Sequence, residues 1–152
     1  MNPGEEIGIL EWQNALAVEE IRRSDALQDP AASYNPRYKD NVIVSLTFAF
    51  SRSVWELSDQ LGQARRYPIA NQLFRSGTAV GALVREAQNA ESRADFIHKM
   101  KIALKEADET EYWLLLCRSM DMGGTDRCLD QLLPIIKVLN KIISTSHANR
   151  AK

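Results

Sequence analysis

The sequence has few glycines, prolines, cysteines and histidines, and each shortage narrows the class of protein. Seven Gly and five Pro in 152 residues are few for an all-β sandwich or barrel, whose many short strands need frequent turn residues. No apolar stretch approaches the roughly 20 residues that a membrane-spanning helix needs. The opening residues, Met1 to Glu6, lack the basic and apolar regions of a secretory signal. We therefore expect a cytoplasmic protein without membrane contact.

The shortage of cysteine and histidine leaves little material for a metal or nucleophilic site. Cys117 and Cys128 fall in predicted helices, and we expect reduced, partly buried thiols there, because a zinc site needs more ligands at closer spacing. A single Asp95-x-x-His98 pattern occurs, whereas di-iron bundles use two Glu-x-x-His motifs. The sequence predicts no catalytic residue, no metal and no cofactor, and hence a protein that is not an enzyme.

What the sequence does contain, from residue 41 onward, is apolar residues that recur every three or four positions. This spacing is typical of helices with one face turned to a core. Breaks at Gly62–Pro68, near Ser92 and at Gly123–Gly124 separate four such helices. Short connections favour antiparallel neighbours. The predicted fold is all-α, an antiparallel up-down-up-down four-helix bundle over residues 41–146, followed by a frayed tail at residues 147–152.

Details within the predicted helices carry further expectations. Ser92 and Asp95 fit a capping box that opens the third helix, and Pro134 is expected to kink the fourth. Gly77 and Gly81 lie four residues apart on the second helix. Each glycine costs about 1 kcal/mol of helix propensity relative to alanine. We therefore expect another backbone to pack closely against this side.

Residues 1–40 form an N-terminal extension with a different character. A weak amphipathic pattern, from Ile7 through Leu10 to Ile21, predicts an accessory helix. Two prolines and small polar residues between positions 28 and 36 predict a linker. The pattern leaves open whether the extension docks on the bundle or is a flexible tail.

Charge is unevenly distributed although the net charge is only −1. Residues 65–105 hold eight Lys/Arg against three Asp/Glu, and residues 106–130 hold two against seven. The chain is therefore polarised. If the second and third helices turn back near residue 91, Arg75 lies opposite Asp108 and Glu109, and we expect an ion pair there.

Two stretches of the sequence resemble one known family. The first runs from Gln72 to Ser92 and contains Arg75-Ser76-Gly77-Thr78; the second runs from Ala94 to Leu114 and contains Lys105-Glu106-Ala107-Asp108-Glu109-Thr110-Glu111-Tyr112-Trp113. They resemble the four-helix-bundle proteins of intervening sequences in bacterial 23S rRNA genes, to which accessory proteins of diversity-generating retroelements are related. The resemblance covers about residues 41–143, and residues 1–40 depart from the usual start of the family.

The resemblance implies a bundle that assembles into a homopentameric ring and has a non-enzymatic role. For the retroelement branch it also implies contact with nucleic acid, RNA or DNA, and with a reverse transcriptase. Those accessory proteins are strongly basic, and this chain departs from them in its net charge.

Two hypotheses for function follow. The first is a nucleic-acid-associated oligomer that contacts phosphates without regard to sequence, through the basic residues Arg65, Arg66, Arg75, Arg85, Arg93, Lys99, Lys101 and Lys105. The second is a protein-interaction scaffold that binds no nucleic acid. Both use an oligomer interface formed by aromatic side chains. Each of them taken alone is more readily assigned to the core of one subunit, but together they are too many for one small bundle: Phe48, Trp55, Phe74 and Trp113. In a head-to-tail ring, the basic face of one subunit would meet the acidic face of the next.

Overall fold

The structure of the protein is a computed structural model that describes Tyr38 and residues 40–148, the last two by their backbone alone. The rest of the predicted N-terminal extension, and residues 149–152 of the predicted tail, lie outside the described residues.

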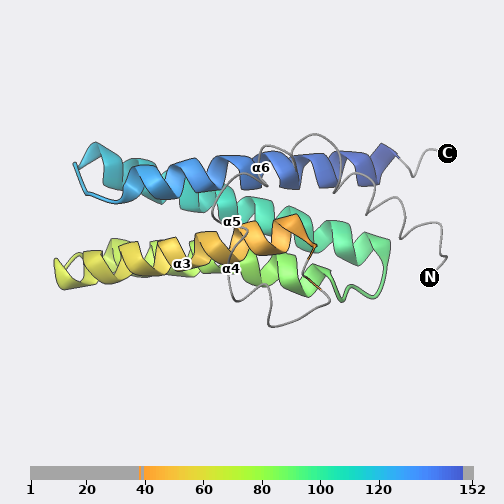
Figure 1. The fold of residues 1–152 in the computed structure, drawn as a ribbon, viewed down its shortest axis with the longest axis horizontal. Helices are drawn as coiled ribbons and strands as arrows, with labels where there is room; N and C mark the ends of the chain where they lie inside the picture. The colour runs from red at the N-terminus through yellow and green to blue at the C-terminus, as the bar shows by residue number, and fades with distance from the viewer. Residues whose placement is uncertain (1–37, 39, 149–152) are drawn as a thin grey trace.

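Four helices make up the described chain. They are α3 (Val42–Gln63), α4 (Tyr67–Ala87), α5 (Arg93–Ser119) and α6 (Thr125–Ala148). Consecutive helices run in opposite directions and pack on each other, and α3 also packs on α6 and closes the bundle (Figure 1). The predicted all-α, up-down-up-down architecture is confirmed. None of the helices in the described part of the chain combines the length and apolar content that crossing a membrane requires.

The core consists of apolar side chains from all four helices. Burying one large aliphatic or aromatic side chain contributes about 1.5–3 kcal/mol relative to leaving it exposed. The largest side chains that are almost fully buried include Phe50, Leu73, Met100, Leu114, Leu132, Ile135 and Leu139. This single core fixes the direction of every helix, and so decides which side chains face outward.

The glycines of α4 bring it close to α3. A Cβ added at Gly77 would lie 2.6 Å from Cγ1 of Val54, and one added at Gly81 would lie 2.9 Å from Oγ of Ser51 and 3.2 Å from the Thr47 carbonyl oxygen. These distances are shorter than van der Waals contact. The expected close approach of another backbone is confirmed at Gly81, whereas Gly77 is packed against a side chain.

The helix boundaries follow local hydrogen bonds. Ser92 caps α5, because its hydroxyl accepts from the Asp95 backbone N–H at 3.1 Å, as the capping box predicted. Helix α4 ends at Ala87, several residues before the break that the sequence predicts near Ser92. Its last turn tightens there: the backbone N–H of Gln88 donates to the Arg85 carbonyl at 3.2 Å. Helix α6 runs through Pro134 without ending.

Helix α3 ends in a left-handed residue that is not glycine. The helix continues through Gly62 to Gln63, and Arg65 then adopts φ 58°. The Arg65 N–H donates to the Gly62 carbonyl at 2.9 Å, and the Arg66 N–H donates to the Leu61 carbonyl at 2.8 Å. This pair of bonds is the Schellman motif, whose left-handed position glycine usually occupies. The sequence placed the stop near Gly62, but the reversal of the chain depends on Arg65.

Candidate nucleic-acid and oligomer interfaces

The eight predicted basic residues do not form one patch, because the antiparallel topology separates them. Arg65 and Arg66 lie in the connection between α3 and α4, at one end of the bundle. Arg93 and Lys99 lie in the first turns of α5, at the other end (Figure 1). A run of positive charge along the sequence is therefore distributed along the length of the bundle.

Three of the eight are engaged in contacts within the chain. The ammonium group of Lys99 lies 3.6 Å from Asp95 and 3.9 Å from Glu86. A guanidinium N–H of Arg93 donates to the backbone carbonyl of Ser146 at 2.7 Å and so ties α5 to the end of α6. Arg85 lies over the ring of Tyr38, with its Cζ 4.7 Å from the ring centroid. These contacts give the three residues a structural role.

The remaining five side chains are exposed: Arg65, Arg66, Arg75, Lys101 and Lys105. Residues 88–92 connect α4 to α5, so positions at equal distance from that connection lie at the same level of the bundle. By this register Arg75 is level with Lys105. Three of the five cations therefore lie on the middle of α4 and α5, and two lie at the α3–α4 connection.

The expected ion pair of Arg75 with Asp108 or Glu109 is wrong. The ion pairs within 4.0 Å among residues 40–148 involve Lys99, Arg118 and Arg127. The turn is centred on residue 90 rather than 91, which shifts the register between α4 and α5. The Glu109 carboxylate instead accepts from Trp113 Nε1 at 3.1 Å.

Three of the four predicted interface aromatics gather on the outer edge of α3 and α4. Trp55 is 62% exposed, Phe48 40% and Phe74 36%. The rings of Trp55 and Phe74 meet edge to face, with centroids 5.2 Å apart. The hydrophobic effect favours covering such a surface. We call Phe48, Trp55 and Phe74 the α3–α4 edge.

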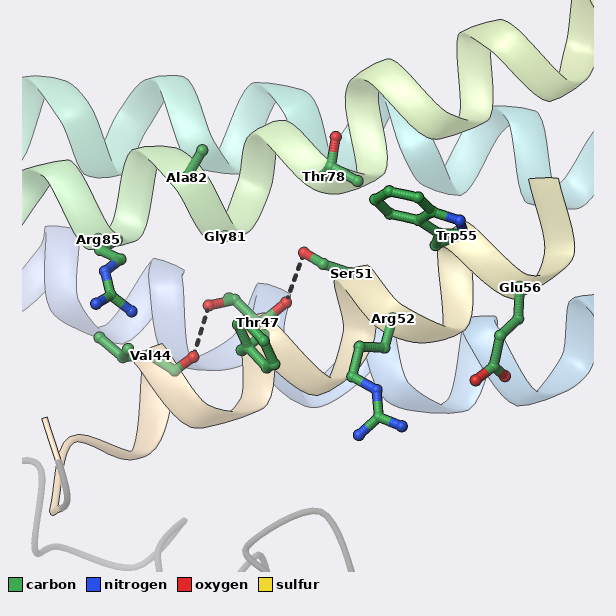
Figure 2. A pocket seen from close by; sticks show the side chains of 11 residues that line it. Val44, Thr47, Ser51, Arg52, Trp55, Glu56, Thr78, Gly81, Ala82 and Arg85 are labelled. Carbon is green, nitrogen blue, oxygen red and sulfur yellow. Dashed lines mark hydrogen bonds between the residues drawn. The ribbon is translucent and has the colours of Figure 1, made fainter. Parts of the chain in front are cut away.

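A groove of about 620 Å³ lies beside this edge, between α3 and α4. Phe48 and Trp55 line it, and Gly81 forms part of its wall without a side chain. The hydroxyls in the groove are occupied by their own helix: Ser51 Oγ donates to the Thr47 carbonyl at 2.9 Å, and Thr47 Oγ1 to the Ile43 carbonyl at 2.8 Å. Figure 2 shows the groove with Arg52, Glu56 and Arg85 among its lining residues. It is apolar inside, with charged groups among its walls.

Trp113 differs from the other three aromatics. It packs against the core, is only partly exposed and meets the ring of its neighbour Tyr112 at a centroid distance of 4.9 Å. Other apolar side chains on the same helix are more exposed and were not predicted as interface residues: Tyr112 59%, Leu116 39% and Met120 61%. Their spacing of four residues was the available signal. We call Tyr112, Leu116 and Met120 the α5 strip.

The two thiols are free, as expected, and both are more deeply buried than the partial burial that the sequence predicted. Desolvation by burial raises the pKa of Cys128 to about 11 and also raises the pKa of Cys117. A thiol with a raised pKa is largely protonated at neutral pH and is a poor nucleophile. Within residues 40–148 no three His, Cys, Asp or Glu side chains gather in a way that would hold a metal ion.

Comparison with known proteins identifies the family. The model of the 23S rRNA-intervening sequence protein family matches residues 39–145. The chain belongs to this family. It is also similar to a crystal structure described as a protein of unknown function from the S23 ribosomal protein family of Bacteroides thetaiotaomicron, with 39% identity and a TM-score of 0.63, over 66% of this chain and 97% of that one. No match was found among curated proteins. The family model leaves residues 1–38 uncovered.

Proposed function

We propose that this 23S rRNA-intervening sequence family protein is a non-enzymatic, self-associating bundle that contacts nucleic acid through phosphate groups. The observation that carries the proposal is that the bundle leaves apolar surface uncovered on two separate faces, the α3–α4 edge and the α5 strip. Family membership, with its link to an rRNA gene, supports nucleic acid as the partner.

The two faces favour a head-to-tail arrangement. They lie on different helices and differ in the charge of the neighbouring residues. Beside the α3–α4 edge lie Arg52 and Arg75 with Glu56, which is paired with Arg127. Four acidic residues and one basic residue precede or accompany the α5 strip: Glu106, Asp108, Glu109, Glu111 and Arg118. A contact between unlike faces generates a ring when the rotation closes, and charge complementarity selects the register. Five subunits is the number implied by the family resemblance.

Assembly would make weak phosphate contacts useful. A ring repeats each exposed cation, and several simultaneous contacts raise the affinity far above that of one subunit. Arg65 and Arg66 are the strongest candidates, because they are exposed at one end of the bundle and neither is used in an ion pair within residues 40–148. Phosphate contact alone would give binding that ignores sequence.

The test is a mobility shift with single-stranded and double-stranded RNA and DNA across a salt series. We expect retardation at low salt that is lost near physiological salt. The reason is that salt cations compete with the lysine and arginine side chains of the protein for the phosphate groups. The double substitution Arg65→Ala and Arg66→Ala should weaken binding several-fold and lower the salt slope by about 2 per subunit engaged. The matched control, Lys137→Ala with Lys141→Ala, removes the same charge from the exposed face of α6 and should change binding much less. Absence of any shift at low salt contradicts the proposal.

The second candidate is a protein-interaction scaffold without nucleic acid. It is favoured by the use of Arg85, Arg93 and Lys99 in contacts within the chain, which leaves less positive charge for phosphate. An oligomer that forms normally but shifts no nucleic acid at low salt would support it. A reverse transcriptase partner stays a prediction of the family resemblance.

A further inference from the structure

The groove between α3 and α4 lies where the N-terminal extension joins the bundle. Tyr38 is only 7% exposed, and its ring lies under Arg85, which lines the groove. The Asn89 amide donates to the Tyr38 hydroxyl at 3.4 Å, and the Asn41 amide donates to Gln88 at 2.8 Å. These contacts hold the base of the extension at the groove's Val44 end.

The length of the extension suits the groove. The α3 residues that line it, from Val44 to Glu56, span about 18 Å at 1.5 Å per residue. The amphipathic stretch from Ile7 to Ile21 would span about 21 Å as a helix. Between that stretch and Tyr38 lie residues 22–37, which reach up to about 50 Å when extended. The stretch can therefore lie along the groove without strain in the connection.

The charge and polarity of residues 1–37 also complement those of the groove. Residues 1–37 carry seven acidic and three basic side chains. Arg52 and Arg85 lie among the lining residues of the largely apolar groove, and its one carboxylate, Glu56, is paired with Arg127 at 3.3 Å. An acidic amphipathic helix laid with its apolar side in the groove would cover Phe48 and Trp55 and leave its carboxylates near the arginines.

We infer that residues 7–21 of the same chain occupy the α3–α4 groove. A tethered segment needs little intrinsic affinity, because the connection holds it at high effective concentration. Docked there, it competes with a neighbouring copy for Phe48 and Trp55 and limits assembly. This consequence rests on the proposed self-association, whereas the docking itself does not.

Cross-linking of the full chain tests the docking. One variant carries Asn14→Cys and Ala82→Cys, which place one thiol in the segment and one on the exposed wall of the groove. The control carries Asn14→Cys and Lys137→Cys, with the second thiol on the exposed face of α6. The native thiols are buried and react slowly. A short bismaleimide should link the first pair within one chain at least tenfold faster than the control pair, and Leu10→Asp with Ile21→Asp should abolish the difference.

The outcomes separate this inference from the proposed function. Equal rates for the two pairs overturn the docking, whatever the oligomeric state. A predominantly dimer-sized product also overturns it, since the groove would then hold a neighbour's segment. Mass by light scattering is measured on the same samples. A rapid link within one chain, with Leu10→Asp/Ile21→Asp still monomeric at all concentrations, upholds the docking and counts against self-association.

Discussion

At the scale of single residues, Arg65 shows a conflict between local conformation and side-chain identity. A non-glycine residue in the left-handed region costs roughly 1 kcal/mol, yet the Schellman bonds of Arg65 and Arg66 require that conformation. We expect Arg65→Gly to raise the free energy of unfolding by about 0.5–1 kcal/mol in urea denaturation. The same change at Asp121, also left-handed with φ 53°, should give less, since Asp tolerates this region better. A loss of stability at position 65 would contradict this account.

Cys128 gives a prediction about pH. Its pKa is raised to about 11 in the folded protein by desolvation, against an ordinary value near 8.5 in the unfolded chain. The buried thiol therefore favours folding below about pH 8.5. Between about pH 8.5 and 11 the unfolded chain ionises and the folded one does not, so this contribution is lost.

The measurement is the slope of unfolding free energy against pH, from urea denaturation between pH 8 and 11. Cys128→Ala should flatten the fall relative to the unchanged chain, even though it lowers stability at every pH by removing a buried side chain. Comparing slopes separates the two effects. Parallel curves would show that folding leaves the pKa of Cys128 unchanged, and would contradict this account.

At the scale of elements, the contact between α3 and α4 depends on Gly77. An added methyl group would lie 2.6 Å from Val54, and overpacking of this kind typically costs about 1–3 kcal/mol. That outweighs the gain of about 1 kcal/mol in helix propensity. We expect Gly77→Ala to destabilise the bundle.

Gly62 is the matched control: it is helical and has nothing within 4 Å of an added Cβ, so Gly62→Ala should stabilise by about 0.5–1 kcal/mol. Thermal unfolding of both variants checks the opposite signs.

The elements were largely predictable because each helix carries its own local signals. The Ser92 cap and the apolar faces of the helices depend on residues within a few positions of one another, and such local patterns can be recognised in the sequence. At the end of α4 the chain could either continue as a helix or tighten into a turn at Gln88, and the structure shows the turn. The spacing of apolar residues does not distinguish these two outcomes. The α5 strip was missed because α5 has apolar residues on more than one side. Buried Leu114 and exposed Met120 look alike in a list of hydrophobic positions.

At the scale of the whole molecule, the candidate site was the least predictable part. The eight basic residues lie within one stretch of the sequence, but the antiparallel fold places Arg65 and Arg93 at opposite ends of the bundle. The partner of Arg93 is a backbone carbonyl 53 residues away, which no local pattern indicates. Trp55 and Phe74 were assigned to the surface by counting aromatics, and their exposure agrees. Their role in assembly stays a prediction.

Assembly through two unlike faces can be tested by breaking each face separately. Trp55→Asp places a charge on the α3–α4 edge, and Met120→Asp places one on the α5 strip. Both side chains are more than half exposed, so neither change should unfold the bundle.

In a head-to-tail ring each variant retains one intact face and has lost the other. Light scattering should find each variant monomeric on its own and at least partly dimeric when the two are mixed in equal amounts, because the mixture contains one intact pair of faces. Asn140→Asp adds the same charge to the exposed side of α6 and should leave the mass unchanged. Had like faces met instead, Trp55 against Trp55, Met120→Asp alone would still associate and mixing would rescue nothing.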